Sequence, residues 1–296
     1  MARAFALDLR AARRAFERSA SSAGEVSVLA REVERRMAER LAYVRVDPAR
    51  VLDAGYGAGE GFELLRAHYP KAQLVGIDFA EPVVRVARAR AGLRERIRTL
   101  FGAARNFHVC AEFSRLPLAS GSFGMVWSNL ALAWAREPSR ALEEFHRVLA
   151  PGGLLMFSSY GPDTLKELRA AFAAADAGAH VHVFADMHDV GDLLVARGFG
   201  TPVMDMELVT LTYTDFDALV RDLKRSGQVN AAGERARGLL GRRAWRRVRE
   251  AYEAMRLDGR LPVTFEIVYG HGWKGVQRAE RQSVVRVDIK RRTPRP

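Results

Sequence analysis

Five short apolar runs between residues 50 and 160 alternate with stretches long enough to form helices, and this alternation restricts the fold more than any other feature. The runs are RVLDAG (50–55), AQLVGIDF (72–79), NFHVCAE (106–112), FGMVWSNL (123–130) and GLLMFSSY (153–160). Continuous apolar runs of this length are typical of parallel strands that are buried on both faces. Because helices separate them, the sequence predicts an α/β fold with a doubly wound, mostly parallel sheet.

The residues after 160 extend this sheet and add helices. Two alternating segments, PVMDMELVTLTY (202–213) and LPVTFEIVYGHGW (261–273), favour antiparallel pairing at a sheet edge. LAPGG (149–153) is expected to form a turn before the fifth strand. The prediction is therefore a Rossmann-like, seven-stranded sheet. Helices that would build a lid over it are expected at about 163–176, 188–197 and 214–256.

Length and composition limit the class of protein. A chain of 296 residues with 48% apolar side chains can bury a full core. No apolar run approaches the roughly 20 residues that span a bilayer, so no membrane segment is expected. An arginine-rich start suits mitochondrial import, but Asp8 and Glu17 count against that reading, and a cytoplasmic protein is expected. The single cysteine, Cys110, excludes an internal disulfide and a cysteine-based metal cluster.

The net charge of +12 is compatible with an acidic partner. Only five of the 47 basic residues are lysine, and a GC-rich genome would produce the same arginine excess without any partner. The basic residues have no spacing with aromatic residues that is typical of a nucleic-acid groove, so no nucleic-acid partner is expected. The histidines, including HVH (180–182), provide no three-ligand cluster, so no metal is expected.

The segment VLDAGYGAGEG (51–61) predicts a ligand-binding loop at the end of the first strand. Glycines there let the backbone turn sharply and approach a ligand. Asp53 precedes the loop, and Asp78 ends the second strand, where a carboxylate can accept both hydroxyl groups of a ribose. The alternative is a strand, turn and helix with a purely structural role. The loop has the form Asp-x-Gly-x-Gly-x-Gly, which differs from the Gly-x-Gly-x-x-Gly of dinucleotide-binding proteins.

This loop, together with residues 115–165, resembles class I S-adenosylmethionine-dependent methyltransferases. GPDTLKEL (161–168), FADMHDVGDLLVARGF (184–199), PVMDME (202–207) and LPVTFEIVYGHGWK (261–274) resemble, more narrowly, the malonyl-acyl carrier protein O-methyltransferase family of biotin synthesis. The resemblance implies transfer of a methyl group from S-adenosylmethionine to the free carboxylate of malonyl-acyl carrier protein. It also implies cofactor contacts from Asp53, Gly55, Tyr56, Gly57, Gly59, Asp78, Phe79, Cys110, Ala111, Glu112, Asn129 and Leu130.

The chain departs from this family's usual pattern at five positions. The family usually has cysteine at Tyr56, aspartate at Cys110 and Gly124, tyrosine near Ala23 and glutamine near Ala30. The Tyr56 ring would either stack beside the cofactor or occupy its space, and Glu112 or a backbone carbonyl would replace the adenine acceptor that is missing at Cys110. The alternatives are a methyltransferase with another acceptor and a relative without activity that acts as a binding or assembly protein.

Methyl transfer to a carboxylate requires no general base, because the carboxylate is already ionised at neutral pH. His188, between Asp186 and Asp189, is the best polar candidate for a catalytic residue, and the alternative is a histidine that bonds the lid backbone. A guanidinium suits the malonyl carboxylate. The expected substrate-binding residues are Tyr213, Arg221, Lys224 and Arg225, although such charges also occur on solvated helix faces.

Four segments are expected from these observations. They are an N-terminal helical cover (1–47), a core that binds S-adenosylmethionine (48–160), a lid with the last edge strands (161–275) and a basic tail (276–296). The cover is expected to contain one or two helices, because apolar residues recur every three or four positions between residues 10 and 45. The arginine-rich stretch 234–260 would attract an acidic carrier protein if it lies beside the pocket mouth.

Overall fold

A computed structural model describes residues 7–22, 28–100, 105–235, 238 and 240–275. The expected basic tail and Ala23 lie outside these residues. The strands are β1 (Arg50–Ala54), β2 (Gln73–Asp78), β3 (Phe107–Cys110), β4 (Phe123–Ser128), β5 (Leu149–Tyr160), β6 (Phe199–Tyr213) and β7 (Leu261–Lys274). The helices are α1 (Leu9–Ser19), α2 (Val28–Leu41), α3 (Gly61–His68), α4 (Glu81–Leu100), α5 (Pro138–Val148), α6 (Lys166–Ala173), α7 (Met187–Ala196), α8 (Phe216–Arg225) and α9 (Arg242–Glu253).

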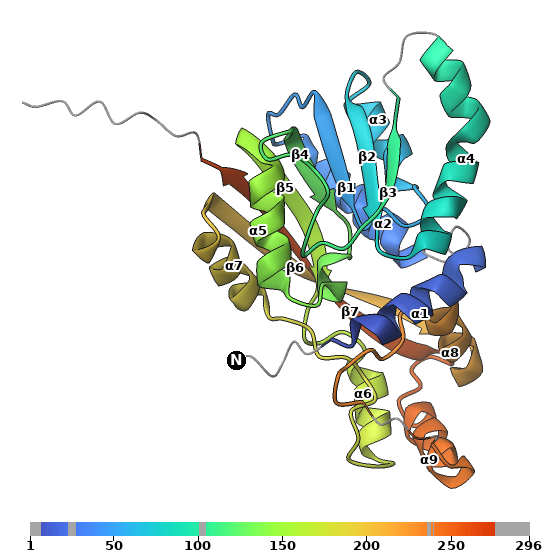
Figure 1. Cartoon of the computed structure of the whole chain (residues 1–296). Coiled ribbons are helices and arrows are strands. Elements are labelled where there is room, and N and C mark those ends of the chain that lie inside the picture. The colour runs from blue at the N-terminus through green and yellow to red at the C-terminus, as the bar shows by residue number, and fades with distance from the viewer. Residues whose placement is uncertain (1–6, 23–27, 101–104, 236–237, 239, 276–296) are drawn as a thin grey trace, which may run out of the picture.

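The strands form one seven-stranded sheet in the order β3-β2-β1-β4-β5-β7-β6 (Figure 1). Strands β1 to β5 run parallel, and β7 runs antiparallel between β5 and β6. The predicted doubly wound sheet with an antiparallel edge is therefore confirmed. The carboxyl ends of β1, β2 and β4 meet at one edge, so the loops that follow these strands converge there.

Alternate residues of each strand pack into two cores, one on each face of the sheet. Val51 of β1 belongs to the core that contains Met37 of α2 and Leu65 of α3. Its neighbour Leu52 belongs to the opposite core, which contains Phe145 of α5. Both faces are therefore covered, as the continuous apolar runs of the strands require. No helix among the described residues is long and apolar enough to cross a membrane.

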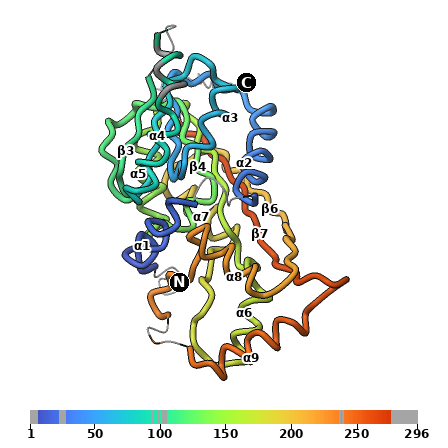
Figure 2. Tube along the Cα trace, turned by 90° about the vertical axis from the view of Figure 1, so that its right-hand side faces the viewer, coloured from blue at the N-terminus to red at the C-terminus, as the bar shows by residue number. Residues whose placement is uncertain are grey.

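The helices after β5 gather at the end of the sheet where β6 and β7 extend beyond the parallel strands. Figures 1 and 2 show α6, α8 and α9 together below the sheet, and α9 contacts both α6 and α8. The single helix expected at 214–256 is instead divided into α8 and α9. The division follows α8, where Gly227 has φ +75°, a left-handed conformation that ends a helix.

The expected turn at 149–153 lies within the bounds of β5. Gly152 has φ +77°, and the register between β4 and β5 shifts between Phe123 and Met125. The glycine thus produces a local irregularity at the start of the strand, and pairing with β4 continues on both sides of it. From Leu154 onward β5 also pairs with β7, so it lies buried between two neighbours.

The N-terminal segment packs against the loop region after α8. Asp8 caps α1 by accepting a hydrogen bond from the backbone N–H of Ala11 at 3.1 Å. The other carboxylate oxygen of Asp8 lies 2.8 Å from Arg235 Nη2. The backbone N–H of Asp8 donates a hydrogen bond to the carbonyl of Ala231. These contacts join residues that are more than 220 positions apart, and they hold α1 over the carboxyl edge of the sheet.

Candidate active site

The glycine loop after β1 takes a conformation that side chains strongly disfavour. Gly55, Gly57 and Gly59 all have positive φ, between +55° and +83°. A β-carbon on Gly55 would also collide with the side chain of Ala131. No atom lies within 4 Å of the place where a β-carbon on Gly57 would be, so this part of the loop presents bare backbone. The alternation of glycine in the sequence therefore produces an open backbone cradle.

Asp78 stands beside this loop at the end of β2. One of its carboxylate oxygens accepts from the backbone N–H of Gly57 at 3.3 Å, and the other accepts from Ala80 at 2.9 Å. Its burial nevertheless raises its pKa to about 6, because desolvation outweighs these hydrogen bonds. The carboxyl group is thus held rigidly against the loop, in the position that suits a ribose diol.

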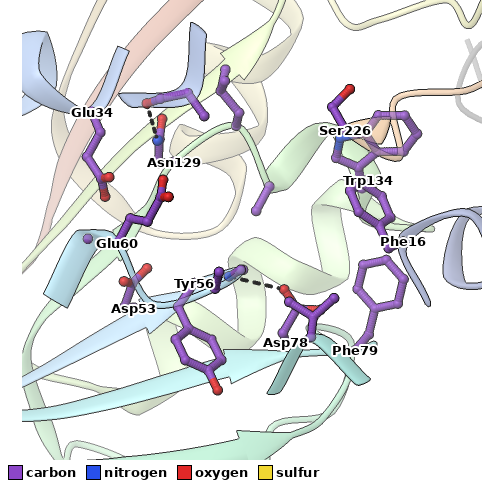
Figure 3. Close-up of a pocket in the computed structure, with 18 of the residues that line it drawn as sticks. Phe16, Glu34, Asp53, Tyr56, Glu60, Asp78, Phe79, Asn129, Trp134 and Ser226 are labelled. Carbon is purple, nitrogen blue, oxygen red and sulfur yellow. Dashed lines mark hydrogen bonds between the residues drawn. The ribbon is translucent and has the colours of Figure 1, made fainter. Parts of the chain in front are cut away.

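A cavity lies above the loop and Asp78 (Figure 3). Three aromatic residues form one wall of the cavity: Phe16 of α1, Trp134 in the loop after β4, and Phe79 after β2. The ring of Phe16 meets the ring of Trp134 edge to face at 5.1 Å and that of Phe79 at 5.6 Å. Ser226 and Gln228, from the segment after α8, complete the lining on this side. Helix α1 and the segment after α8 therefore both contribute to the cavity.

The ring of Tyr56 packs beneath the loop and points away from the cavity (Figure 3). It covers Gly76 of β2, where any β-carbon would overlap the ring, and it lies 5.5 Å from the ring of Phe62 and 5.7 Å from that of His108. Its hydroxyl group is buried without a hydrogen-bond partner. Tyr56 is among the residues that line the cavity, and its ring is directed out of the space where a ligand would lie.

Three carboxyl side chains border the other side of the cavity. They are Glu34 of α2, Asp53 of β1 and Glu60 at the start of α3. The indole N–H of Trp127 donates to Glu34 Oε1 at 3.2 Å, whereas Asp53 Oδ2 is buried without a partner. Burial raises the pKa of Glu34 to about 7 and raises the pKa of Asp53 well above its usual range.

Sequence reasoning overlooked Glu34, although a signal was present. Leu29, Val33, Met37 and Leu41 form the buried face of α2, and Glu34 lies beside Val33 and Met37 on that face. A charged residue on an apolar helix face is uncommon unless it has a partner or a ligand.

Asn129 connects the strand edge to α2. Its side-chain N–H donates to the carbonyl of Ala30 at 2.9 Å, and its oxygen accepts from Ser158 Oγ at 2.8 Å. Leu130 follows with φ +54°, a strained conformation for leucine that its backbone bonds to Ser158 help to hold. Both residues line the cavity, and their contact with a cofactor stays a prediction.

The other predicted cofactor residues lie at or beyond the rim. Gly59 borders a neighbouring cavity, and Cys110, Ala111 and Glu112 do not line the main one. Cys110 Sγ lies 3.8 Å from the carbonyl oxygen of Phe79, and Glu112 accepts from Ser114. The expectation that Glu112 or a backbone carbonyl replaces the missing adenine acceptor stays a prediction.

His188 is exposed at the start of α7 and lines no part of the cavity. Asp186 accepts from the backbone N–H of His188 at 2.7 Å, so this carboxylate caps the helix and does not orient the imidazole ring. The ring of His182 stacks on that of Trp134, which lines the cavity, with 5.9 Å between the ring centroids. Burial lowers the pKa of His182 to about 4. Among the described residues no group of histidine, cysteine and acidic side chains could hold a metal ion.

Three of the four predicted substrate residues border a second cavity between α2, β6 and α8. Tyr213, Arg221 and Arg225 line it, and Lys224 does not. Tyr213 donates to Asp222 at 2.5 Å, and both arginines are exposed. This cavity shares Ser226 and Gln228 with the main cavity, so the two adjoin at these residues. The arginine-rich helix α9 lines neither of them, and its Arg249 pairs with Asp217 of α8.

Comparison with known proteins identifies the family. A family model described as a methyltransferase domain matches residues 52–157. The malonyl-acyl-carrier-protein O-methyltransferase of Laribacter hongkongensis is 52% identical over 282 residues, covering 95% of each chain. The protein of the same name from Gallionella capsiferriformans is 48% identical over 277 residues, covering 94% of each chain.

A solved structure supports the fold independently. The YcgJ protein of Bacillus subtilis superposes with a TM-score of 0.57 at 15% identity, covering 83% of this chain and 99% of that one. Since the sequence similarity to the named relatives extends over nearly the whole chain, this protein belongs to the malonyl-acyl-carrier-protein O-methyltransferase family.

Proposed function

We propose that this protein transfers a methyl group from S-adenosylmethionine to the free carboxylate of malonyl-acyl carrier protein, in biotin synthesis. Family membership supports the reaction, and one observation carries it for this chain. The open glycine cradle, Asp78 and Tyr56 border one cavity, and the ring of Tyr56 points away from it, toward Gly76. The position of this ring favours a working enzyme over a relative without activity.

The residues present fit S-adenosylmethionine. Asp78 would accept the ribose hydroxyl groups, Phe79 would lie along the adenosine, and the backbone at Gly57 would pass close to the ligand. The partnerless oxygen of Asp53, at the other side of the cavity, has the chemistry to accept from an amino group. When bound, the cofactor supplies an electrophilic methyl group on a positively charged sulfur.

The chain itself contributes alignment and exclusion of water. Phe16, Trp134 and Tyr160 provide an apolar wall around the cavity, which strips water from an incoming carboxylate. Because the acceptor carboxylate is ionised at neutral pH, no residue has to remove a proton from it. Methyl transfer in this cavity therefore needs no ionisable base at the aromatic wall. For the same reason, the exposed position of His188 is compatible with catalysis.

The acceptor would reach the methyl group through the second cavity. Arg221 and Arg225 stand at its exposed rim, and Ser226 and Gln228 lie where it adjoins the main cavity. A malonyl group on a long, flexible carrier arm would enter past the two guanidinium groups, which suit carboxylate and phosphate oxygens. Tyr213, bonded to Asp222, would form one wall of this route.

The test is a methyl-transfer assay with purified protein, S-adenosylmethionine and malonyl-acyl carrier protein, with the methyl ester detected by mass spectrometry. We expect one added methyl group per malonyl group. Acetyl-acyl carrier protein, which has no free carboxylate, is the matched control and should remain unchanged. Binding of S-adenosylhomocysteine without methylation of malonyl-acyl carrier protein would indicate another acceptor. Absence of binding would indicate a protein that retains only the scaffold.

A further inference from the structure

The acidic side of the main cavity contains two buried carboxyl groups that face one another. Asp53 is 2% exposed and Glu34 is 8% exposed. A β-carbon added to Gly61 would collide with Glu34 Oε1 and would lie 2.9 Å from Asp53 Oδ2, so both oxygens approach the same point. Figure 3 shows Glu34, Glu60 and Asp53 along one side of the cavity, with Asp78 and Phe79 on the other.

The groups around this pair do not neutralise it. Trp127 of β4 donates one hydrogen bond to Glu34, and Asp53 Oδ2 has no partner. The nearby cations, Arg31 of α2 and Arg90 of α4, lie 3.7 Å and 4.0 Å from Glu60 and are directed to that carboxylate. The remaining charged neighbour, Asp78, adds a further negative charge that raises the pKa of Asp53.

Two such carboxyl groups cannot both ionise without a cation nearby. Desolvation and mutual repulsion keep at least one proton on a pair of this kind near neutral pH. Consistent with this, burial raises the pKa of both Glu34 and Asp53. An ammonium group placed between them would stabilise the doubly ionised form and would satisfy the free oxygen of Asp53 with a charge-assisted hydrogen bond. The pair therefore has the properties of a receptor for a small cation.

We propose that Glu34 and Asp53 together bind the α-ammonium group of S-adenosylmethionine, and that the pair releases a proton to solvent when this group binds. The inference rests on the proposed function, because it requires the same ligand in the same cavity. If Asp78 holds the ribose, the amino-acid end of the ligand extends toward the opposite side of the cavity, where Glu34 and Asp53 lie.

Helix α2 is held firmly enough to present Glu34 in a fixed position. Arg36 of this helix pairs with Glu207 of β6 at 2.7 Å, and Arg40 pairs with Asp205 at 2.7 Å. Asn129 also bonds the backbone of α2 at Ala30. The N-terminal cover thus supplies a ligand-binding group, in addition to closing the cavity.

Calorimetric titration with two ligands tests the proposal. S-adenosylhomocysteine has the α-ammonium group, and 5′-methylthioadenosine keeps the adenosine and sulfur without the amino-acid part. Glu34→Gln replaces one carboxyl group of the pair with a neutral amide. The amide N–H can donate a hydrogen bond to Asp53, but the amide cannot carry a negative charge. We expect this variant to bind S-adenosylhomocysteine roughly 10- to 100-fold more weakly, since a charged hydrogen bond is lost. Its affinity for 5′-methylthioadenosine should stay within about twofold of the unaltered protein.

The proton is measured by repeating the titration at pH 7 in buffers with different ionisation enthalpies. The unaltered protein should release about one proton per S-adenosylhomocysteine, and Glu34→Gln should release less. Glu39→Gln, an exposed acid on the same helix, is the matched control and should behave like the unaltered protein. Retained binding of 5′-methylthioadenosine by Glu34→Gln shows that the variant has folded.

The proposal is overturned if Glu34→Gln binds S-adenosylhomocysteine as tightly as the unaltered protein does, or if both ligands weaken alike. It is also overturned if the unaltered protein binds S-adenosylhomocysteine without releasing a proton. In these cases the unaltered protein still binds the ligand, so the proposed methyltransferase function stands. Failure of the unaltered protein to bind S-adenosylhomocysteine would contradict both the proposed methyltransferase function and the proposed role of Glu34 and Asp53.

Discussion

At the scale of single residues, Tyr56 shows how a large side chain is accommodated in a glycine loop. The ring uses the space above Gly76 on the neighbouring strand, which has no β-carbon to compete for it. The cost is a buried hydroxyl group without a partner. Such a group typically lowers stability by about 1–3 kcal/mol relative to a bonded one.

Replacing Tyr56 with phenylalanine should therefore leave the fold intact and raise the free energy of unfolding by about 1 kcal/mol. Urea unfolding monitored by circular dichroism measures the change. Tyr269→Phe is the control, because the Tyr269 hydroxyl bonds Glu207 and its removal should lower stability. A lower midpoint for Tyr56→Phe would mean that its hydroxyl has a partner in solution, such as a bound water.

Glu34 makes the stability of the protein depend on pH. Its pKa in the folded chain is about 7, above the ordinary value of 4.5, so the folded state binds more protons than the unfolded state between these values. The free energy of unfolding should consequently fall as pH rises through this window, by an amount on the order of 3 kcal/mol. Glu34→Gln should have a smaller slope, because the contribution of Glu34 is lost while Asp53 and Asp78 keep raised pKa values, and it should be the more stable protein at pH 8.

Urea unfolding at pH 5 and pH 8 provides the measurement for both proteins in the absence of ligand. Glu39→Gln, whose carboxylate is exposed, should keep the slope of the unaltered protein. Equal slopes for Glu34→Gln and the unaltered protein would show that Glu34 ionises normally in the folded state.

At the scale of elements, the end of α8 positions α1 over the cavity. Gly227 has φ +75°, and a β-carbon there would lie 2.8 Å from Phe16 Cδ1 and 2.9 Å from Ser19 Oγ. Both contacts belong to α1, and Phe16 and Ser19 line the main cavity. The end of α8 and helix α1 therefore meet at a position where only glycine fits.

Gly227→Ala should push α1 outward and lower the free energy of unfolding by about 1–3 kcal/mol, through backbone strain and overpacking. Because Phe16 moves with α1, the affinity for S-adenosylhomocysteine should fall as well. Urea unfolding and calorimetric titration measure the two effects. Gly92→Ala, in α4 with no atom within 4 Å of the added carbon, should instead stabilise the protein by about 0.5–1 kcal/mol. Unchanged ligand affinity in Gly227→Ala would argue against a role for this junction in the cavity.

At the scale of the whole molecule, the net charge of +12 is not distributed evenly with respect to the cavities. Arg221 and Arg225 border the second cavity, whereas the exposed arginines of α9, such as Arg243, border neither. The arginines of α9 were expected beside the pocket mouth, but the arginines that border a cavity there belong to α8. An acidic carrier protein would be oriented by charges near the entrance.

Arg221→Glu should lower kcat/KM for malonyl-acyl carrier protein by roughly tenfold, and Arg243→Glu should change it by less than about twofold. The kcat/KM of the unaltered protein should also decrease with added salt, because screening weakens attraction beyond about 10 Å at 0.1 M salt. Steady-state methyl-transfer assays at several salt concentrations give both results. An equal loss in the two variants would indicate a general effect of net charge instead of a local entrance.

The sequence alone determined the sheet, because strand burial and helix spacing are recorded in local apolar patterns. It also determined the glycine loop and Asp78, since positive φ and a strand-end carboxylate both leave local signatures. The resemblance to the family came from motifs of the same local kind. The division of residues 214–256 into two helices was missed, because helical periodicity continues on both sides of a loop.

Only the tertiary structure decided where side chains point across elements. The direction of the Tyr56 ring depends on Gly76, twenty positions away, and the carboxyl pair depends on α2 packing Glu34 against Asp53. Likewise, the exposed position of His188 follows from the way α7 packs on the sheet edge. These are long-range contacts, set by the simultaneous packing of several elements, so no local pattern in the chain could specify them.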